Sequence, residues 1–389
     1  MTTPMMAALS AELEQRERQG LLRNRRMIDG AQGARVTLEG REYLSFCSND
    51  YLGLASHDSL KAAFCEGVSQ AGVGTGASHL LTGHHRLHHE AEMALADFVK
   101  LPRALLFSCG YMANLGVLSS LLGRNDAVFS DRLDHASLND AAILSRAKLH
   151  RFGHNDLTAL EGFLTKSTAK NKIVAVDAVY SMDGDIAPLP ELLQLCDLHD
   201  AYLLLDDAHG FGVMGANGRG ILEHFAKASS RIIYMATLGK SFGVAGAFVA
   251  GDPLIIEYLM QTARTYIYTT ASPAALASAV IEAIQLVRNE PQRRTHLFHL
   301  IETFQKECRL KEWRLSPSRT AIQPIVVGSN EKALSLSEYL LSSGILVPAI
   351  RPPTVPQGSS RLRVSISASH SLDDIHRLIS ALKQAEKLL

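Results

Sequence analysis

One lysine and a pair of acids have a spacing that could hold a cofactor. Asp206 and Asp207 follow the apolar run Leu203–Leu205, and Lys240 lies 34 positions after Asp206 in a loop bounded by glycine. A strand, a helix and a second strand need about that length, so both side chains would reach the same edge of a parallel sheet. A lysine amine can hold an aldehyde covalently, and a carboxylate can keep a pyridine nitrogen protonated. The pattern therefore predicts pyridoxal phosphate attached at Lys240 and supported by Asp206.

These residues also have a simpler explanation, in which the two acids belong to a turn and Lys240 lies on the surface. Three glycines argue for a ligand site instead. Gly239, Gly243 and Gly246 surround the lysine, and glycine allows the backbone to approach a bound group closely. The cofactor is therefore the preferred interpretation, and it requires further groups for a phosphate and a flat ring.

A phosphate needs hydrogen-bond donors, and one helix start could supply them. Cys109–Met112 opens an apolar helix that is expected to run to about Leu122. The first N–H groups of a helix lack partners within it and bind anions. The hydroxyls of Thr237, Thr269 and Thr270 could add donors. An ordinary glycine turn before a helix would explain Cys109–Met112 equally well.

Two further polar residues follow expected strands. His135 comes after the apolar run Ala127–Ser130, where an imidazole could stack on a flat heterocycle. A capping or core histidine is the alternative for that position. Ser181 follows Tyr180 at the end of another apolar run and has no independent signal of its own.

Two other motifs resemble known binding sites but lack part of the pattern. Gly72–Gly76 resembles a dinucleotide loop, yet the helical pattern of Asp58–Gln70 precedes it where a strand is required. His84–Glu90 resembles a metal cluster, since His85 and His89 would share one helix face. No third ligand is evident for that cluster. We therefore expect a solvated helix start there and no metal site.

The elements around these residues alternate between apolar runs and amphipathic stretches. The expected strands are 127–130, 172–177, 201–206, 231–235 and 247–250, with helices at 157–166 and 189–198. This alternation is typical of an α/β fold with a mostly parallel sheet that is covered on both faces.

The C-terminal part has a different pattern. A long connecting helix at 274–288 precedes strands at 322–327, 345–350 and 361–367 and helices at 331–342 and 372–388. These elements predict a smaller α+β domain. We expect a helical N-terminal arm at 1–45, a large cofactor-binding domain at 46–285 and the small C-terminal domain at 286–389.

Charge and cysteine usage restrict the functional class. Lys plus Arg and Asp plus Glu number 39 each, so bulk charge gives no reason to expect a nucleic-acid partner. No apolar run is long enough for a membrane span. Five scattered cysteines without a C-x-x-C spacing fit reduced thiols in a cytoplasm.

Several motifs together resemble one enzyme family, over the chain from about residue 20 to the C-terminus. They are Ser48–Leu54, Gly74–Ser78, Asp131–Ala136, Tyr180–Asp185, Asp206–Gly210 and Thr237–Lys240. This set resembles the α-oxoamine synthases, which are dimeric pyridoxal-phosphate enzymes of fold type I. Ala321–Pro324 and Ala349–Pro356 are similar to the biotin-pathway subgroup in particular. The loop Ser78–Gly83 departs from some members of that subgroup, which leaves its substrate contacts open.

The resemblance implies a role for each matching residue around the cofactor ring. Lys240 would attach the ring covalently, and Asp206 would bind its pyridine nitrogen. His135 would stack on one face. The phenolic oxygen would accept hydrogen bonds from His209 and Ser181.

The remaining implied contacts reach the other ring face, the phosphate and the substrates. Ala208 would leave room on the second face of the ring. The residues that would bind the phosphate are Gly110, Tyr111, Thr237 and, from the partner subunit, Thr269 or Thr270. Asn49 and Arg363 would hold the amino-acid carboxylate. Arg23, in the arm, would guide the acyl substrate.

The subgroup implies a decarboxylative condensation of L-alanine with a pimeloyl thioester, carried by coenzyme A or by acyl carrier protein. A homodimer is implied with it. Two alternatives stay open. One is a fold-type I relative with different chemistry, such as an aminotransferase or glycine C-acetyltransferase (2-amino-3-ketobutyrate ligase). The other is a metal hydrolase that uses His84–Glu90.

Overall fold

The computed structural model describes residues 3–389, which form two compact units. The larger unit contains residues 52–181 and 185–294. The smaller unit contains the chain up to residue 51, residues 182–184 and residues 295–389. Across these described residues, no helix combines the length and apolar character that crossing a bilayer requires.

The larger unit is built on a seven-stranded sheet in the order β4-β10-β9-β8-β7-β5-β6. Its strands are β4 (Arg103–Phe107), β5 (Ala127–Asp131), β6 (Lys148–Phe152), β7 (Lys172–Asp177), β8 (Tyr202–Asp206), β9 (Ile232–Thr237) and β10 (Ala247–Gly251). The strands from β9 to β6 are parallel, whereas β10 runs antiparallel to both of its neighbours. Leu203–Leu205 are completely buried, as expected for a strand covered on both faces. The predicted α/β class with a mostly parallel sheet is confirmed.

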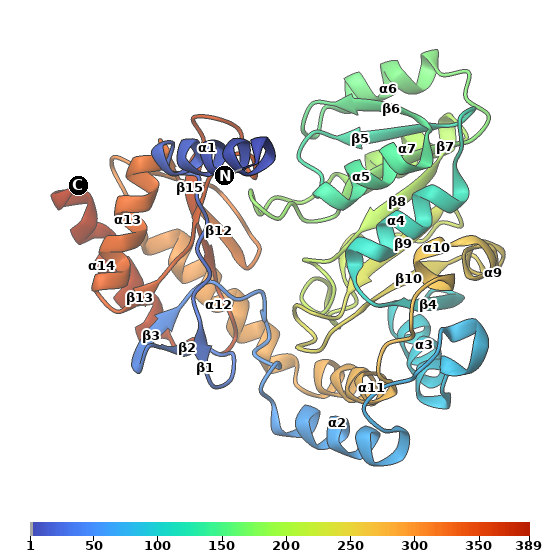
Figure 1. Cartoon of the computed structure of the whole chain (residues 1–389), viewed down its shortest axis with the longest axis horizontal. Helices are drawn as coiled ribbons and strands as arrows, with labels where there is room; N and C mark the ends of the chain where they lie inside the picture. The colour runs from blue at the N-terminus through green and yellow to red at the C-terminus, as the bar shows by residue number, and fades with distance from the viewer. Residues whose placement is uncertain (1–2) are drawn as a thin grey trace. The chain divides into compact units, whose positions relative to one another are not determined.

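Helices between the strands cover the sheet of the larger unit (Figure 1). They are α2 (Asp58–Ala71), the π-helical turn η1 (His79–Gly83), α3 (Arg86–Val99), α4 (Gly110–Leu121), α5 (Ala136–Ser145), α6 (Leu157–Lys166), α7 (Leu189–Leu198), α8 (Ile221–His224), α9 (Pro253–Thr262), α10 (Arg264–Ile267) and α11 (Ala274–Asn289). The core forms where apolar residues of α4 and α5, such as Val117 and Leu138, pack on Val128 and Ile233 of the strands.

Helices α2 and α11 approach each other closely at a glycine. A Cβ atom on Gly67 would lie 2.7 Å from Cα of Ala275 and 2.7 Å from Oγ of Ser278. A real Cβ atom does not tolerate such distances, so only glycine permits this spacing of the two helices.

The smaller unit contains two four-stranded sheets, in the orders β1-β2-β3-β13 and β11-β12-β15-β14. The strands are β1 (Ile28–Asp29), β2 (Arg35–Leu38), β3 (Arg41–Ser45), β11 (Arg314–Leu315), β12 (Ile322–Gly328), β13 (Ile345–Leu346), β14 (Ala349–Ile350) and β15 (Ser360–Ser365). The helices are α1 (Pro4–Arg18), α13 (Asn330–Ser342), α14 (Leu372–Leu388) and α12 (Pro291–Glu307), which spans the boundary between the units. Strands near the two ends of the chain thus share a sheet, since β3 pairs in parallel with β13.

Two expectations for the smaller unit are corrected by the structure. The single strand expected at 345–350 is two short strands in different sheets, because β13 pairs with β3 and β14 pairs with β15. The break lies at Val347 and Pro348, and proline cannot donate a ladder hydrogen bond. The segment 1–45, expected as a helical arm, also contains β1, β2 and β3 after α1. Met1 and Thr2 of that segment lie outside the described residues, and the three expected domain boundaries stay predictions.

Candidate active site

The larger unit has a cavity of ≈ 180 Å³ at the carboxyl ends of its central strands. Asp177, Asp206 and Thr237 end the strands β7, β8 and β9, where ligands bind in open α/β sheets. The residues that line the cavity are Gly110, Tyr111, His135, Ser137, Asp177, Asp206, Ala208, His209, Met235, Thr237 and Lys240. Most of the predicted cofactor-binding residues are therefore brought together.

Lys240 lies in the loop between β9 and β10 and contacts a histidine. Its Nζ donates a hydrogen bond to Nε2 of His209 over 2.7 Å. The next residue fixes the loop, since Oγ of Ser241 donates to the carbonyl of Phe211 over 2.6 Å. Gly243 has a φ of +67°, and a Cβ there would collide with the backbone at Leu54 and Ala55. This glycine allows the loop to pack against neighbouring backbone, which explains its place beside the lysine.

Asp206 is 5% exposed, and both of its oxygens accept hydrogen bonds. Its Oδ1 accepts from the N–H of Ala208 over 3.1 Å, and its Oδ2 accepts from Nδ2 of Asn114 over 2.8 Å. Two donors of this kind fix the direction of the carboxylate. Asp206 can therefore present a negative charge to the cavity.

Asn114 connects Asp206 to the predicted stacking histidine. Its Nδ2 also donates to Oγ of Ser137 over 2.9 Å, and that hydroxyl lies 2.8 Å from Nδ1 of His135. Asn114 is completely buried in α4. Four side chains from three elements thus form one hydrogen-bonded chain behind the cavity.

His135 occupies the N-cap of α5, where its Nδ1 accepts from the N–H of Ser137. Its own N–H donates to Oδ1 of Asp177 over 3.3 Å. Burial lowers the pKa of His135, with the charge of Lys240 acting in the same direction and that of Asp206 opposing it. The ring is therefore held as a neutral imidazole, which suits stacking on an aromatic ring.

Asp207 has a different environment from its neighbour. It is completely buried, and its Oδ2 accepts from Tyr234 Oη over 2.8 Å and from the N–H of Ile221 over 2.7 Å. Burial raises the pKa of Asp207 to about 7. The side chain does not line the cavity, so its contacts hold the start of α8.

The start of α4 offers donors for an anion. Cys109 is the N-cap residue, and its side chain forms no capping hydrogen bond. The amide groups of the first turn, including those of Gly110 and Tyr111, are therefore available to a phosphate. Thr237 Oγ1 donates to the carbonyl of Gly246 over 3.1 Å. The hydroxyl of Tyr111 donates to Asp140.

These groups fit pyridoxal phosphate. An amine, a buried oriented carboxylate and a neutral imidazole line the same cavity as a helix start without a side-chain cap. They are the groups that an aldehyde, a pyridine nitrogen, a flat ring and a phosphate require.

Three predicted cofactor residues do not line this cavity. Ser181 follows β7 by four positions, and Thr269 and Thr270 lie in the connection between α10 and α11. The hydroxyl of Thr269 lies 3.5 Å from the carbonyl of Thr270. The contribution of these two threonines to a partner subunit stays a prediction.

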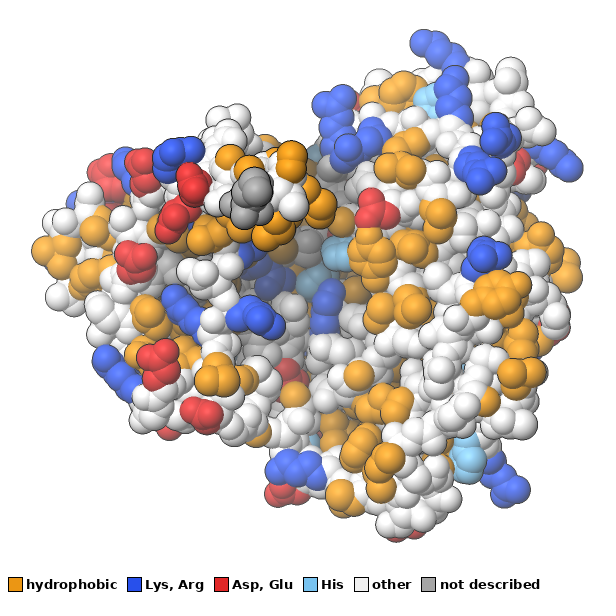
Figure 2. All heavy atoms as spheres, viewed as in Figure 1, with side chains coloured by type: hydrophobic (Ala, Val, Ile, Leu, Met, Phe, Trp, Pro, Cys, Tyr) orange, Lys and Arg blue, Asp and Glu red, His pale blue; other side chains and the backbone are white. Residues whose placement is uncertain are grey.

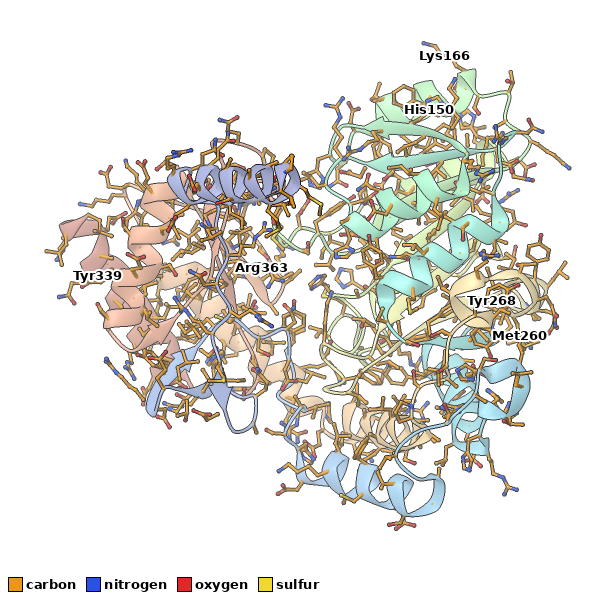
Figure 3. The ribbon with its side chains drawn as sticks, in the orientation of Figure 1. His150, Lys166, Met260, Tyr268, Tyr339 and Arg363 are labelled. Atoms are coloured by element: carbon orange, nitrogen blue, oxygen red, sulfur yellow. The ribbon has the colours of Figure 1, made fainter. Side chains whose placement is uncertain are left out.

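The predicted substrate-binding residues lie in the smaller unit. Arg363 is on β15 (Figure 3) and is 5% exposed. Its guanidinium donates to Oδ1 of Asn49 over 3.0 Å, to Ser365 Oγ over 2.9 Å and to Tyr51 Oη over 3.3 Å. The structure therefore brings the predicted pair Asn49 and Arg363 together.

A second arginine on the same strand, Arg361, already has an ionic partner. Arg361 forms an ion pair with Asp183 over 2.6 Å and donates to the carbonyl of Met182 over 3.1 Å. Arg361 is as buried as Arg363. Arg23 is exposed and donates to Oγ1 of Thr354 over 3.2 Å.

Sequence reasoning missed several residues of this site. Asn114, Ser137 and Asp177 were not predicted, and neither was Met235. Asn114 carried one signal, because it is a polar residue within the apolar helix Gly110–Leu121. The rejection of Gly72–Gly76 as a nucleotide loop is supported, since α2 ends directly before it.

Comparisons with known proteins agree with this geometry. A sequence profile of the aminotransferase class I and II family matches residues 41–382. Proteins named 8-amino-7-oxononanoate synthase from Methylobacillus flagellatus and Nitrosospira multiformis are 59% and 57% identical to this chain. The alignments cover 99% and 96% of this chain and 97% and 95% of those proteins.

Two solved structures are similar over most of the chain. A serine palmitoyltransferase variant from S. paucimobilis with bound PLP-myriocin has a TM-score of 0.91 and 29% identity, covering 98% of this chain and 97% of that one. An 8-amino-7-oxononanoate synthase from Francisella tularensis has a TM-score of 0.77 and 32% identity, covering 89% and 97%.

Proposed function

The chain belongs to the aminotransferase class I and II family of pyridoxal-phosphate enzymes, and from this membership we propose that it makes 8-amino-7-oxononanoate for biotin synthesis. The substrates would be L-alanine and a pimeloyl thioester. One structural observation supports the proposal most, namely that Lys240, Asp206 and His135 line one cavity beside the start of α4. The names of relatives at 50–59% identity supply the substrate class.

The reaction joins the Cα of alanine to the pimeloyl carbonyl carbon, expels the thiol and releases the alanine carboxylate as CO2. When bound, pyridoxal phosphate supplies an electron-withdrawing ring that stabilises negative charge at Cα. Asp206 would hold a proton on the pyridine nitrogen, because its carboxylate is fixed by two hydrogen bonds. Nζ of Lys240 would remove the Cα proton.

Other residues would position the reacting groups. His209 contacts Nζ of Lys240 and would hydrogen-bond the phenolic oxygen of the ring together with Ser181. Arg363 and Asn49 would bind the alanine carboxylate, since a guanidinium can grip it with two parallel hydrogen bonds. Ala208 would leave one ring face open, and Arg23 would guide the acyl chain.

We also propose a homodimer, in which Thr269 or Thr270 of one subunit reaches the phosphate of the other. Figure 2 shows apolar side chains exposed over the helices of the larger unit. Large exposed apolar residues of that unit include Val73, Leu81 and Tyr268. The proposal leaves the acyl carrier open between coenzyme A and acyl carrier protein, and the cytoplasmic location stays a prediction.

The test is to find where the cofactor is attached. Borohydride reduction of the yellow protein followed by peptide mapping should label Lys240, and Lys240→Ala should lose turnover and bind the cofactor only weakly. Label on another lysine would falsify the assignment. Product analysis with alanine and pimeloyl thioester, and in parallel with glycine and acetyl thioester, then separates the proposed reaction from that of a glycine C-acetyltransferase. A product formed from glycine and acetyl thioester alone would contradict the proposal.

A further inference from the structure

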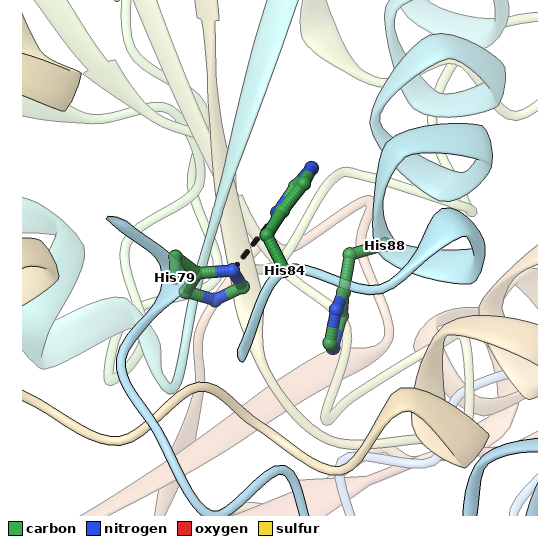
Figure 4. Close-up of side chains that lie close together, drawn as sticks. All are labelled: His79, His84 and His88. Carbon is green, nitrogen blue, oxygen red and sulfur yellow. Dashed lines mark hydrogen bonds between the residues drawn. The ribbon is translucent and has the colours of Figure 1, made fainter. Parts of the chain in front are cut away.

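A group of histidines lies outside the cavity, between η1 and the start of α3 in the larger unit. Figure 4 shows His79, His84 and His88 side by side. Their ring centroids are 5.2 Å apart for His79 and His84, 4.9 Å for His79 and His88 and 5.7 Å for His84 and His88. The proposed function uses none of these side chains, although each carries nitrogen atoms that bind transition metals.

His88 has a structural role, because both nitrogens of its ring contact backbone groups. Its Nδ1 accepts from the N–H of His85 over 3.0 Å, and its Nε2 lies 2.8 Å from the carbonyl of Ser272. Both ring nitrogens of His88 are therefore occupied by backbone groups. A metal ligand at this position would have to give up one of these hydrogen bonds.

His79 and His84 form a pair with one another. Their Nδ1 atoms are 3.0 Å apart, so one ring donates a hydrogen bond to the other. His79 is 8% exposed and stacks on Tyr266, whereas His84 is exposed. A buried ring thus orients an exposed one. The pairing uses Nδ1 of His84, which leaves Nε2 as its nitrogen for a ligand.

His84 also lies close to His89 and Glu92, and the three side chains form a candidate coordination set. One ligand atom of each of His84, His89 and Glu92 lies within 4.8 Å of the others. His89 and Glu92 are three positions apart on α3 and so share a helix face. Glu92 is itself oriented, because its Oε1 accepts from the N–H of Leu106 over 2.9 Å.

We propose that His84, His89 and Glu92 form a binding site for a divalent transition-metal ion such as Zn²⁺. Two imidazole nitrogens and one carboxylate oxygen are a donor set that zinc accepts, with a fourth position left for water. His79 would act as the outer partner that fixes the His84 ring, as hydrogen-bonded neighbours of metal-binding histidines do. The sequence showed no third ligand near His84–Glu90, and the structure supplies one in Glu92. This site does not depend on the proposed acyl transfer.

The test measures Zn²⁺ binding to the holoenzyme after unbound cofactor has been removed. Equilibrium competition against a chromogenic chelator should find one tightly bound equivalent of Zn²⁺ per chain, and its binding should require His84 and His89. His84→Ala, His89→Ala and Glu92→Gln should each weaken that equivalent at least tenfold. His224→Ala removes an exposed histidine elsewhere in the unit and should leave the affinity within twofold. The exposed thiols of Cys65 and Cys109 are unchanged in every variant, so any zinc that they bind cancels in the comparison.

Two results would overturn the proposal. The first is the absence of any Zn²⁺ equivalent that the three substitutions weaken. The second is a loss in His84→Ala with parental affinity in both His89→Ala and Glu92→Gln, because the inner histidines would then bind the ion. The visible absorbance of the bound cofactor and the far-ultraviolet circular dichroism spectrum of each variant verify its fold. Glu92→Gln preserves the acceptor for the Leu106 amide, so this variant tests the charge with little structural change.

Discussion

Asp206 and Asp207 show how adjacent residues of one chemical type receive different tasks. Successive side chains point to opposite faces of a strand, and these two acids continue that alternation at the end of β8. Asp206 lines the cavity and accepts hydrogen bonds from two donors, whereas Asp207 is buried against Tyr234 and the start of α8. Only Asp206 is therefore placed to meet a cofactor.

Substitution of Asp206 by Asn should slow proton removal from alanine. The change preserves the shape of the side chain and removes the charge that keeps the pyridine nitrogen protonated. We expect alanine Cα–H exchange in deuterated water, followed by NMR, to slow roughly 100-fold, which corresponds to about 2.7 kcal/mol. Asp207→Asn is the matched control and should exchange at nearly the parental rate. Parental exchange in Asp206→Asn would remove the proposed role.

Substitution of Arg363 by Lys should weaken alanine binding. A lysine cannot reproduce the two parallel hydrogen bonds of a guanidinium to a carboxylate. The dissociation constant of alanine, measured from the change in cofactor absorbance, should rise at least tenfold while the spectrum without alanine stays parental. Arg361→Lys is the control, since its guanidinium is engaged by Asp183. The opposite ranking of the two variants would assign the carboxylate to Arg361.

Substitution of Asn114 by Ala should loosen both Asp206 and His135. The buried amide donates to Asp206 and to Ser137, which in turn contacts His135. A lost hydrogen bond to a charged group costs about 1.5–3 kcal/mol, so the cofactor dissociation constant should rise at least tenfold. Titration of apoprotein with pyridoxal phosphate measures it. Ser137→Ala removes the hydroxyl that joins Asn114 to His135 but keeps the hydrogen bond from Asn114 to Asp206, so it should raise the dissociation constant less. Equal effects of the two substitutions would show that Asn114 has no separate role through Asp206.

The residues that sequence alone could place were those with a spacing rule. Lys240 and Asp206 are one strand–helix–strand step apart, and Gly110 opens an apolar helix. Asn114 and Ser137 act through a neighbouring side chain rather than on a ligand. No periodic pattern marks such contacts, because they depend on how α4 and α5 are packed together.

At the level of elements, the crossing of α2 and α11 should depend on Gly67. Gly67→Ala places a methyl group against Ala275 and Ser278, and overpacking of this kind costs about 1–3 kcal/mol. Gly162 of α6 is the control, because a Cβ there meets nothing within 4 Å. Gly162→Ala should stabilise by about 0.5–1 kcal/mol through helix propensity. Thermal unfolding midpoints of both variants should therefore shift in opposite directions.

Elements with a clear repeat were predicted closely, and short ones were not. The helices at 157–166, 189–198 and 372–388 are confirmed at both ends. The two-residue strands β13 and β14 were merged into one, since a pair of residues carries no repeat. Which sheet each joins is decided by partners more than 10 positions away in sequence.

For the molecule as a whole, the buried carboxyl of Asp207 should make stability depend on pH. Its pKa is about 7 in the folded protein and about 3.9 in an unfolded chain. The unfolded state therefore loses this proton first as pH rises, and the stabilisation present below pH 3.9 is lost by about pH 7. The free energy of unfolding of Asp207→Asn, relative to that of the parent, should therefore rise by about 2–3 kcal/mol from pH 5 to pH 7. This follows because each pH unit between the two pKa values changes the stability of the parent by about 1.4 kcal/mol. Urea unfolding of both proteins at pH 5 and at pH 7 measures this change. The same pH dependence in parent and variant would exclude Asp207 as its source.

The pairing of β3 with β13 determines the order in which parts of this protein can fold during translation. Domains commonly fold from the N-terminus as the chain emerges, yet here β3 must wait until Ile345 and Leu346 have been synthesised. The intervening larger unit, residues 52–181 and 185–294, is complete well before that moment. We therefore expect a nascent chain whose middle is protected from protease while its leading segment is still cut. Full protection of residues 28–45 should come only with the last 45 residues, and truncation before Ile345 should leave β3 without its partner strand β13.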